Sequence, residues 1–201
     1  MERQRGTTIA IVAALIIAVV SLGVAFAAFS TTLNIGGTAT VQTSNWDIYF
    51  MTASSGTKPS SSTSLPAANI SGTAQSATGS IVATTLTWSA SFKKPGEYAV
   101  FKVYVKNGGT YNAKITGITK GGITCSTDPK GVCDHLHYEI YTDSSCTTAL
   151  AQNRGLNAGA EDVFYVKAWL DDTGWSTDGS DLPTTAVTSS TISATITYTQ
   201  Q

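Results

Sequence analysis

Residues 7–29 form an uncharged, almost wholly apolar run, TTIAIVAALIIAVVSLGVAFAAF, and this run decides where the rest of the chain folds. Arg3 and Arg5 precede the run, and no charged residue follows it before Asp47. Because positive residues stay on the cytoplasmic side of a membrane, we expect everything after Phe29 to be exported. The sequence therefore predicts a domain that works at the cell surface or in the extracellular space.

The end of the apolar run carries a processing signal. Ala25-Phe26-Ala27 fits the A-x-A pattern of signal peptidase, which would cut before Ala28. A helix of this length can also cross a bilayer whose hydrocarbon core is about 30 Å thick. Two outcomes therefore stay open: residues 1–27 are a signal peptide that is removed, or they are a membrane anchor helix that is kept. Only an uncleaved chain would contact the membrane, through residues 7–29.

The exported part, residues 28–201, is long enough for a single domain with a sizeable core. The whole chain has 12 basic and 13 acidic residues, so it lacks the excess of Lys and Arg that phosphate binding needs, and nucleic acid is not expected as a partner. Threonine is abundant, and its branched β-carbon favours strands. This composition predicts an all-β domain.

Alternation of apolar and polar residues predicts about nine strands and no amphipathic helix. Residues 98–106 and 111–118 are expected to form a hairpin across the Asn-Gly-Gly turn at 107–109. Residues 53–80 are rich in Ser, Thr, Ala and Gly and poor in apolar surface, which predicts a flexible surface loop. Short strands separated by turn residues favour a two-sheet sandwich over a barrel.

Three cysteines follow the loop: Cys125, Cys133 and Cys146. Outside the cytoplasm disulfides persist, and an odd number leaves one thiol over. The spacer between Cys125 and Cys133 contains an Asp-Pro step and a glycine, so a turn can bring these two together. The pairing of Cys133 with Cys146 stays open.

Several segments together resemble one family. The quoted residues are AFAAFSTTLNI at the end of the apolar run, VKNGGTYNAKITGI, LNAGAEDVFYVKAWL and LPTTAVTSSTISATITYTQ. They are similar to the secreted TasA/camelysin-like proteins of biofilm matrices and cell surfaces. The resemblance implies a jelly-roll or immunoglobulin-like sandwich whose subunits polymerise, so that the main partner of the chain is another copy of itself. It also implies that an N-terminal strand of one subunit completes the sheet of the next.

The segment after the predicted cut has the form of such a donor strand. Its apolar face is followed directly by a flexible Gly36-Gly37 hinge, and a free strand can add to an open sheet edge through main-chain hydrogen bonds. The alternative is that the strand pairs within its own sandwich, because edges are normally covered inside a domain. The residues of this face are Phe29, Thr31, Leu33 and Ile35.

Candidate metal sites are weak. Cys133, His135 and His137 alternate and would share one face of a strand, but structural zinc sites usually have four ligands and no fourth is evident. A loop with four carboxylates could hold Ca²⁺, yet its spacing differs from an EF-hand, and a solvated acidic loop is the favoured interpretation. Its carboxylates are Asp171, Asp172, Asp178 and Asp181.

No nucleophile and base can be paired, and no glycine-rich phosphate loop follows a strand. We therefore expect neither an enzyme nor a cofactor. Two rivals to the fibre subunit remain. One is a type IV-pilin-like subunit, cut after Gly6 so that the helix is kept; the other is a monomeric surface adhesin or binding module that presents loops such as 171–181.

Overall fold

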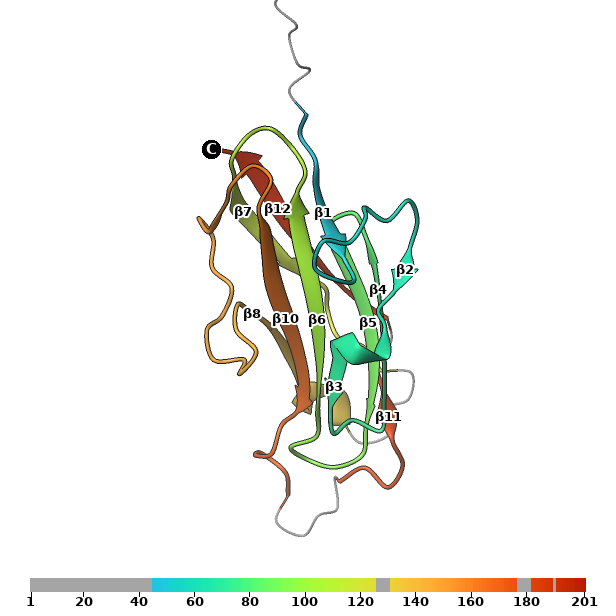
Figure 1. The fold of residues 1–201 in the computed structure, drawn as a ribbon. Helices are drawn as coiled ribbons and strands as arrows, with labels where there is room; N and C mark the ends of the chain where they lie inside the picture. The colour runs from blue at the N-terminus through green and yellow to red at the C-terminus, as the bar shows by residue number, and fades with distance from the viewer. Residues whose placement is uncertain (1–44, 126–130, 177–181, 190) are drawn as a thin grey trace, which may run out of the picture. The chain divides into compact units, whose positions relative to one another are not determined.

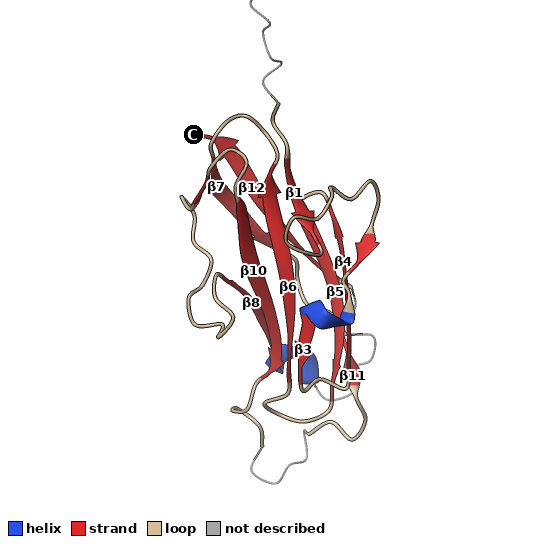
Figure 2. Ribbon diagram, viewed as in Figure 1, coloured by secondary structure: helices blue, strands red, loops and turns tan. Residues whose placement is uncertain are grey.

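Strands make up about half of the part of the chain that can be described, and most of the rest is turns and loops. The computed structural model describes residues 45–125, 131–176, 182–189 and 191–201. The chain divides into residues 1–42 and 43–201, and all described residues belong to the second unit. These residues form two antiparallel sheets that face each other in a sandwich-like arrangement, with two short 3₁₀ turns and no α-helix among them (Figures 1 and 2). The predicted all-β fold is confirmed at this level.

Sheet 1 holds the longest strands. Its order is β1-β6-β10-β8, and the short β3 pairs with the same side of β6 as β1 does, further along the strand. Every pairing in this sheet is antiparallel. The strands are β1 (Ile48–Met51), β3 (Ile70–Gly72), β6 (Tyr98–Asn107), β8 (Leu136–Tyr141) and β10 (Glu161–Leu170).

Sheet 2 has the order β2-β4-β5-β12-β7-β9, and β11 pairs with the far end of β5. The central strand β12 lies between β5 and β7, which makes the carboxyl-terminal residues the middle of this sheet. The strands are β2 (Thr63–Ser64), β4 (Ser76–Val82), β5 (Thr85–Phe92), β7 (Ala113–Lys120), β9 (Gly155–Leu156), β11 (Val187–Thr188) and β12 (Ile192–Gln200).

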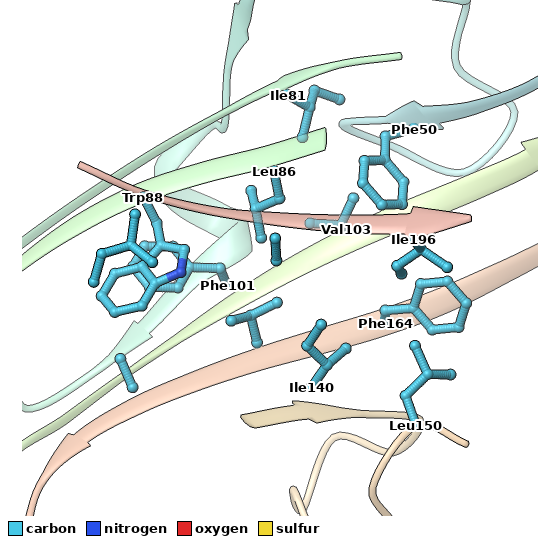
Figure 3. Packing of buried hydrophobic residues seen from close by; sticks show 14 of the residues in the cluster. Phe50, Ile81, Leu86, Trp88, Phe101, Val103, Ile140, Leu150, Phe164 and Ile196 are labelled. Carbon is cyan, nitrogen blue, oxygen red and sulfur yellow. The ribbon is translucent and has the colours of Figure 1, made fainter. Parts of the chain in front are cut away.

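The core lies between the two sheets (Figure 3). Alternate residues of each long strand are buried, as the period-two pattern of the sequence predicts. Trp88 of β5 packs against Phe101 of β6, with ring centroids 5.6 Å apart, and so joins the sheets. Burial of each such side chain is worth roughly 1.5–3 kcal/mol, and this apolar contact holds the layers together.

The segment 53–80 differs from the flexible loop that its composition predicts. It contains β2, the 3₁₀ turn Ala67–Asn69, β3 and most of β4. Leu65 is buried in the core, and the side chain of Asn69 donates a hydrogen bond of 2.5 Å to the carbonyl of Thr52. Its small side chains pack because main-chain pairing with β5 and β6, rather than apolar bulk, orders the segment. These short strands, with β9 and β11, explain why the described residues hold twelve strands instead of about nine.

The expected hairpin at 98–118 is also wrong. Strand β6 lies in sheet 1 and β7 in sheet 2, so Asn107–Gly109 leads the chain from one sheet to the other. The buried side chain of Asn107 donates hydrogen bonds to the carbonyls of Tyr111 and Leu156, and its oxygen accepts one from the N–H of Gly109. An Asn whose side chain bonds the main-chain groups of a crossing between sheets has the same sequence signature as an Asn in a hairpin turn. The sequence pattern alone could therefore not separate the two arrangements.

The apolar run, the processing signal, the predicted donor strand and the Gly36-Gly37 hinge all lie in residues 1–44, outside the described residues. The same holds for Asp178 and Asp181. Among the described residues, none forms a helix of the length and apolarity that crossing a membrane requires.

Candidate functional site

Among the described residues, the central strand of sheet 2 is paired on only one side over its last residues. β5 pairs with β12 from Ile192 to Thr195 and then ends at the turn Ala83–Thr84, whereas β7 accompanies β12 to Gln200. Across this turn, the N–H of Ile196 donates to the carbonyl of Thr84 at 3.4 Å. In the described part of the chain no strand pairs with residues 197–200 on the β5 side. Main-chain groups on that side can therefore accept an additional strand.

Strand β1 of sheet 1 lies opposite this open edge. The N–H of Phe50 donates to the carbonyl of Ala83 at 2.7 Å, which ties β1 to the β4–β5 turn. Beyond that bond, β1 pairs with β6 on one side only among the described strands. Two incomplete edges, one from each sheet, thus face each other at the same end of the sandwich (Figure 1).

Between these edges lies a groove of about 330 Å³, which we call the edge groove. Trp46 is 44 % exposed and forms one wall as an accessible indole, while Ile196 and Tyr198 lie nearly buried beneath the groove at 2 % and 9 % exposure. Half of the lining residues are polar or charged. Burial raises the pKa of the Tyr198 hydroxyl, which has no hydrogen-bond partner among the described residues. The lining residues are Trp46, Asp47, Ile48, Lys58, Ala83, Thr84, Thr195, Ile196, Thr197 and Tyr198.

The chain that enters the groove is held by the β6–β7 connection. Thr110 N–H donates to the carbonyl of Asn45, and Gly108 N–H donates to the carbonyl of Asp47. A Cβ at Gly109 would lie 2.3 Å from the Asn45 carbonyl oxygen, so this close approach requires glycine. Asp47 also forms an ion pair with Lys58 at the rim. The wall formed by residues 45–48 is therefore fixed in place.

The opposite end of the sandwich is closed by a disulfide. Cys125 and Cys133 lie at disulfide distance, with sulfur atoms 2.13 Å and Cα atoms 5.9 Å apart, and Cys146 is the free cysteine. This is the pairing that the turn-forming spacer favoured over Cys133–Cys146. Cys125 forms an isolated bridge with Ser189, whose N–H donates to the carbonyl of Ala90 in β5. The disulfide thus attaches the irregular segment to sheet 2.

The residues that the sequence offered as weak candidates for metal ligands do not form a metal site among the described residues. Cys133 and His135 lie in the 3₁₀ turn Val132–His135, not on the strand that the sequence predicted, and His135 stacks on Trp175 with centroids 4.1 Å apart. His137, on β8, has its Nε2 3.6 Å from Asp171 Oδ2. Among the described residues, no three His, Cys, Asp or Glu side chains group as metal ligands would.

The acidic loop is organised by its own hydrogen bonds where it is described. The N–H and the hydroxyl of Thr173 both donate hydrogen bonds to the Asp171 carboxylate. These bonds lower the pKa of that carboxyl, and the bond from the backbone N–H contributes most. Trp175 Nε1 donates to the Asp171 carbonyl at 2.8 Å, and Trp175 packs partly buried against the core at this end.

Sequence reasoning did not find the edge groove. The alternation around Trp46 predicted a strand, but no sequence signal marks the residue at which β5 stops pairing with β12. Comparison with family models, with curated proteins and with solved structures gives no match to this chain. Any function assigned to the groove must therefore come from its geometry.

Proposed function

We propose that this chain is an exported structural subunit that assembles into fibres at the cell surface or in a biofilm matrix. The observation that carries the proposal is the edge groove, where two sheet edges that the described strands leave incomplete flank a lining that includes Trp46, Ile48 and Ile196. A strand with one apolar face would pair its main chain with β12 and place its side chains in that groove. In this proposal the donor is residues 29–35 of a neighbouring subunit, with Gly36-Gly37 as hinge.

The fold supports this proposal in a second way. From β5 to β8 successive long strands alternate between sheet 2 and sheet 1, as in a jelly-roll or immunoglobulin-like sandwich, and we propose that class for the domain. Such a sandwich is closed at its sides only when every edge is covered. A donated strand would cover the side of β12 that the described strands leave open over residues 197–200.

The length of the connecting segment permits two arrangements. Residues 36–45 span at most about 33–36 Å when fully extended, at roughly 3.3–3.6 Å per residue. That reach allows residues 29–35 to enter either their own groove or a neighbour's groove. The proposal requires the second arrangement, so the experiment must separate the two.

Complementation between two defective variants separates them. Leu33→Asp/Ile35→Asp places charge on the donor face and keeps the groove, while Trp46→Glu places charge in the groove and keeps the donor. Each variant, exported by its host, is expected to give no filaments in electron micrographs. Mixed together, they should form one-to-one heterodimers, because one intact donor meets one intact groove.

The matched control is Tyr111→Glu, which alters an aromatic residue of similar exposure (40 %) outside the groove and should leave the filaments unchanged. A mixture that stays monomeric, together with unfolding of the Leu33→Asp/Ile35→Asp variant, would assign the strand to its own sandwich and overturn the proposal. Mass spectrometry of the mature amino terminus completes the test. Ala28 agrees with cleavage and export, Thr7 with a pilin-like subunit, and Met1 with a retained anchor.

A further inference from the structure

The outer face of sheet 1 carries an alternating set of aromatic and lysine side chains. They occupy the positions of β6 and β10 that alternate with buried core residues, and they point away from sheet 2. We call this set the aromatic–lysine face. Its members are Tyr98, Lys102 and Tyr104 on β6 and Tyr165, Lys167 and Trp169 on β10.

Strand register brings these side chains together. Tyr98 lies directly opposite Trp169, and Lys102 lies directly opposite Tyr165. Each strand therefore contributes both aromatic and lysine side chains to the face. The ammonium of Lys102 lies 4.8 Å from the ring centroid of Tyr104. That of Lys167 lies 5.3 Å from the Tyr98 ring and 5.7 Å from the Trp169 ring. These cation–π contacts hold the ammonium groups beside the rings.

The positive charge at the centre of the face is not neutralised by a carboxylate within ion-pair distance. Among the described residues, neither Lys102 nor Lys167 forms an ion pair. Glu139 is the cross-strand neighbour of Lys167, but its carboxylate is bound by Lys120 of the other sheet. Two ammonium groups are therefore available to an anion that approaches the face.

The second nearby carboxylate, on Glu161, is also engaged. It accepts hydrogen bonds from Ser54 and from Lys106 at the groove end of the same sheet. At the other end of the face Tyr98 is 36 % exposed, and neither it nor Trp169 belongs to the residues packed against the core. Tyr98 is therefore exposed, and Tyr104, Tyr165 and Trp169 are half-buried, so the rings of the face are partly accessible to a ligand.

From this arrangement we infer that the aromatic–lysine face binds an anionic polysaccharide, a chain of uronic-acid sugars. The C–H face of a sugar ring can stack on Tyr165 or Trp169, because the face of an aromatic ring carries negative charge. The sugar carboxylates would accept hydrogen bonds from Lys102 and Lys167. These lysines are diagonal neighbours across an antiparallel pair, a position in which Cα atoms are about 7–8 Å apart. One extended polysaccharide chain can therefore contact both lysines.

Charge density favours such a polysaccharide over nucleic acid. Duplex DNA carries one charge per roughly 1.7 Å, and binding it requires a correspondingly dense set of Lys and Arg. The face offers two unpaired ammonium groups beside Glu139 and Glu161, on a chain with a net charge of −1. A polymer with one carboxylate per sugar matches this sparse charge, and oligothymidylate serves as the competing probe.

Binding of decagalacturonate to the exported protein at low ionic strength tests the inference. We expect the Lys102→Gln/Lys167→Gln variant to bind about tenfold or more weakly and to lose most of the salt dependence, because it loses two charge-assisted hydrogen bonds. Trp169→Ala should also weaken binding but keep the salt dependence. Neutral dextran should not compete.

The matched controls are Lys114→Gln and Tyr111→Ala, which change the same residue types away from the face and should bind like the unchanged protein. Absence of decagalacturonate binding would overturn the inference. Equal weakening by the control variants, or binding of oligothymidylate as tight as that of decagalacturonate, would overturn it as well. Filament formation is not required for any of these measurements.

Discussion

The two ends of the sandwich differ in how the space between the sheets is closed. At the disulfide end, which we define by Trp88, the Cys125–Cys133 bridge and the stack of His135 on Trp175, side chains fill that space. At the groove end, defined by the edge groove, β12 extends past the last residue that β5 pairs with. Side chains complete one end, whereas at the other end the described strands leave main-chain groups of β12 without a pairing strand. Under the proposed function, stability and assembly would depend on opposite ends of the fold.

The two tryptophans give the largest test of this contrast. Trp88 is 1 % exposed and contacts Phe101 and Tyr138, so Trp88→Ala should lower the free energy of unfolding by about 3–5 kcal/mol. Trp46 is exposed at the groove, so Trp46→Ala should change the free energy of unfolding by about 0.5 kcal/mol or less. The same substitution should weaken assembly. Urea unfolding of both variants, with filament yield measured in parallel, checks the pair. Equal stability losses would contradict the division between the ends.

The disulfide should contribute the next largest effect. The two cysteines are eight residues apart in sequence, and closing so short a loop is worth about 2–3 kcal/mol in the chain-entropy model. Cys125→Ser/Cys133→Ser should therefore lower the unfolding free energy by that amount, and Cys146→Ser should leave it nearly unchanged. Thermal unfolding under non-reducing conditions makes the comparison. Unimpaired stability of the double variant would show that packing alone closes this end.

At the groove end, Asn107 is the residue on which the crossing between sheets depends. Asn107→Ala would leave the N–H of Gly109 and two carbonyls without their side-chain partner, at a cost of about 1–3 kcal/mol. Asn112→Ala, whose side-chain oxygen accepts one hydrogen bond from the exposed Ala158 N–H, is the control and should cost less. Hydrogen exchange at Gly109 is expected to accelerate in the first variant only.

The smallest predicted effect is a loss of stability at low pH that depends on Glu97. Burial favours the neutral form of Glu97, yet the N–H groups of Lys93 and Lys94 and the amide of Gln75 outweigh it and lower the pKa of the carboxyl below 4.5. A depressed folded-state pKa stabilises the protein above the unfolded-state value, and this stability is lost as the pH falls through the folded-state value. Urea midpoints between about pH 6 and pH 3 should drop less for Glu97→Gln than for the unchanged protein. If the urea midpoints of the two proteins fall equally between these pH values, Glu97 is not the cause of the loss of stability in acid.

The sequence predicted parts of this fold for identifiable reasons. The alternation in β6, β10 and β12 survives because each strand has one buried face, which is the condition under which a period of two appears. The Cys125–Cys133 pairing could be favoured from the sequence because the two cysteines are only eight positions apart. The segment 53–80 was misassigned because β3 and β4 are ordered by main-chain pairing with distant strands, which side-chain composition does not encode.

By itself, the sequence determined the strand-rich class of the domain and the apolar run that precedes it, and it favoured the Cys125–Cys133 pairing without excluding Cys133–Cys146. All of these depend on residues close together in the chain. Only the tertiary structure decided that the Asn-Gly-Gly turn crosses between sheets and that β12 continues beyond β5. It also decided that lysines and aromatic rings from β6 and β10 share one face. The physical reason is that register and sheet membership depend on which distant strands pair, and that choice is made by the core as a whole.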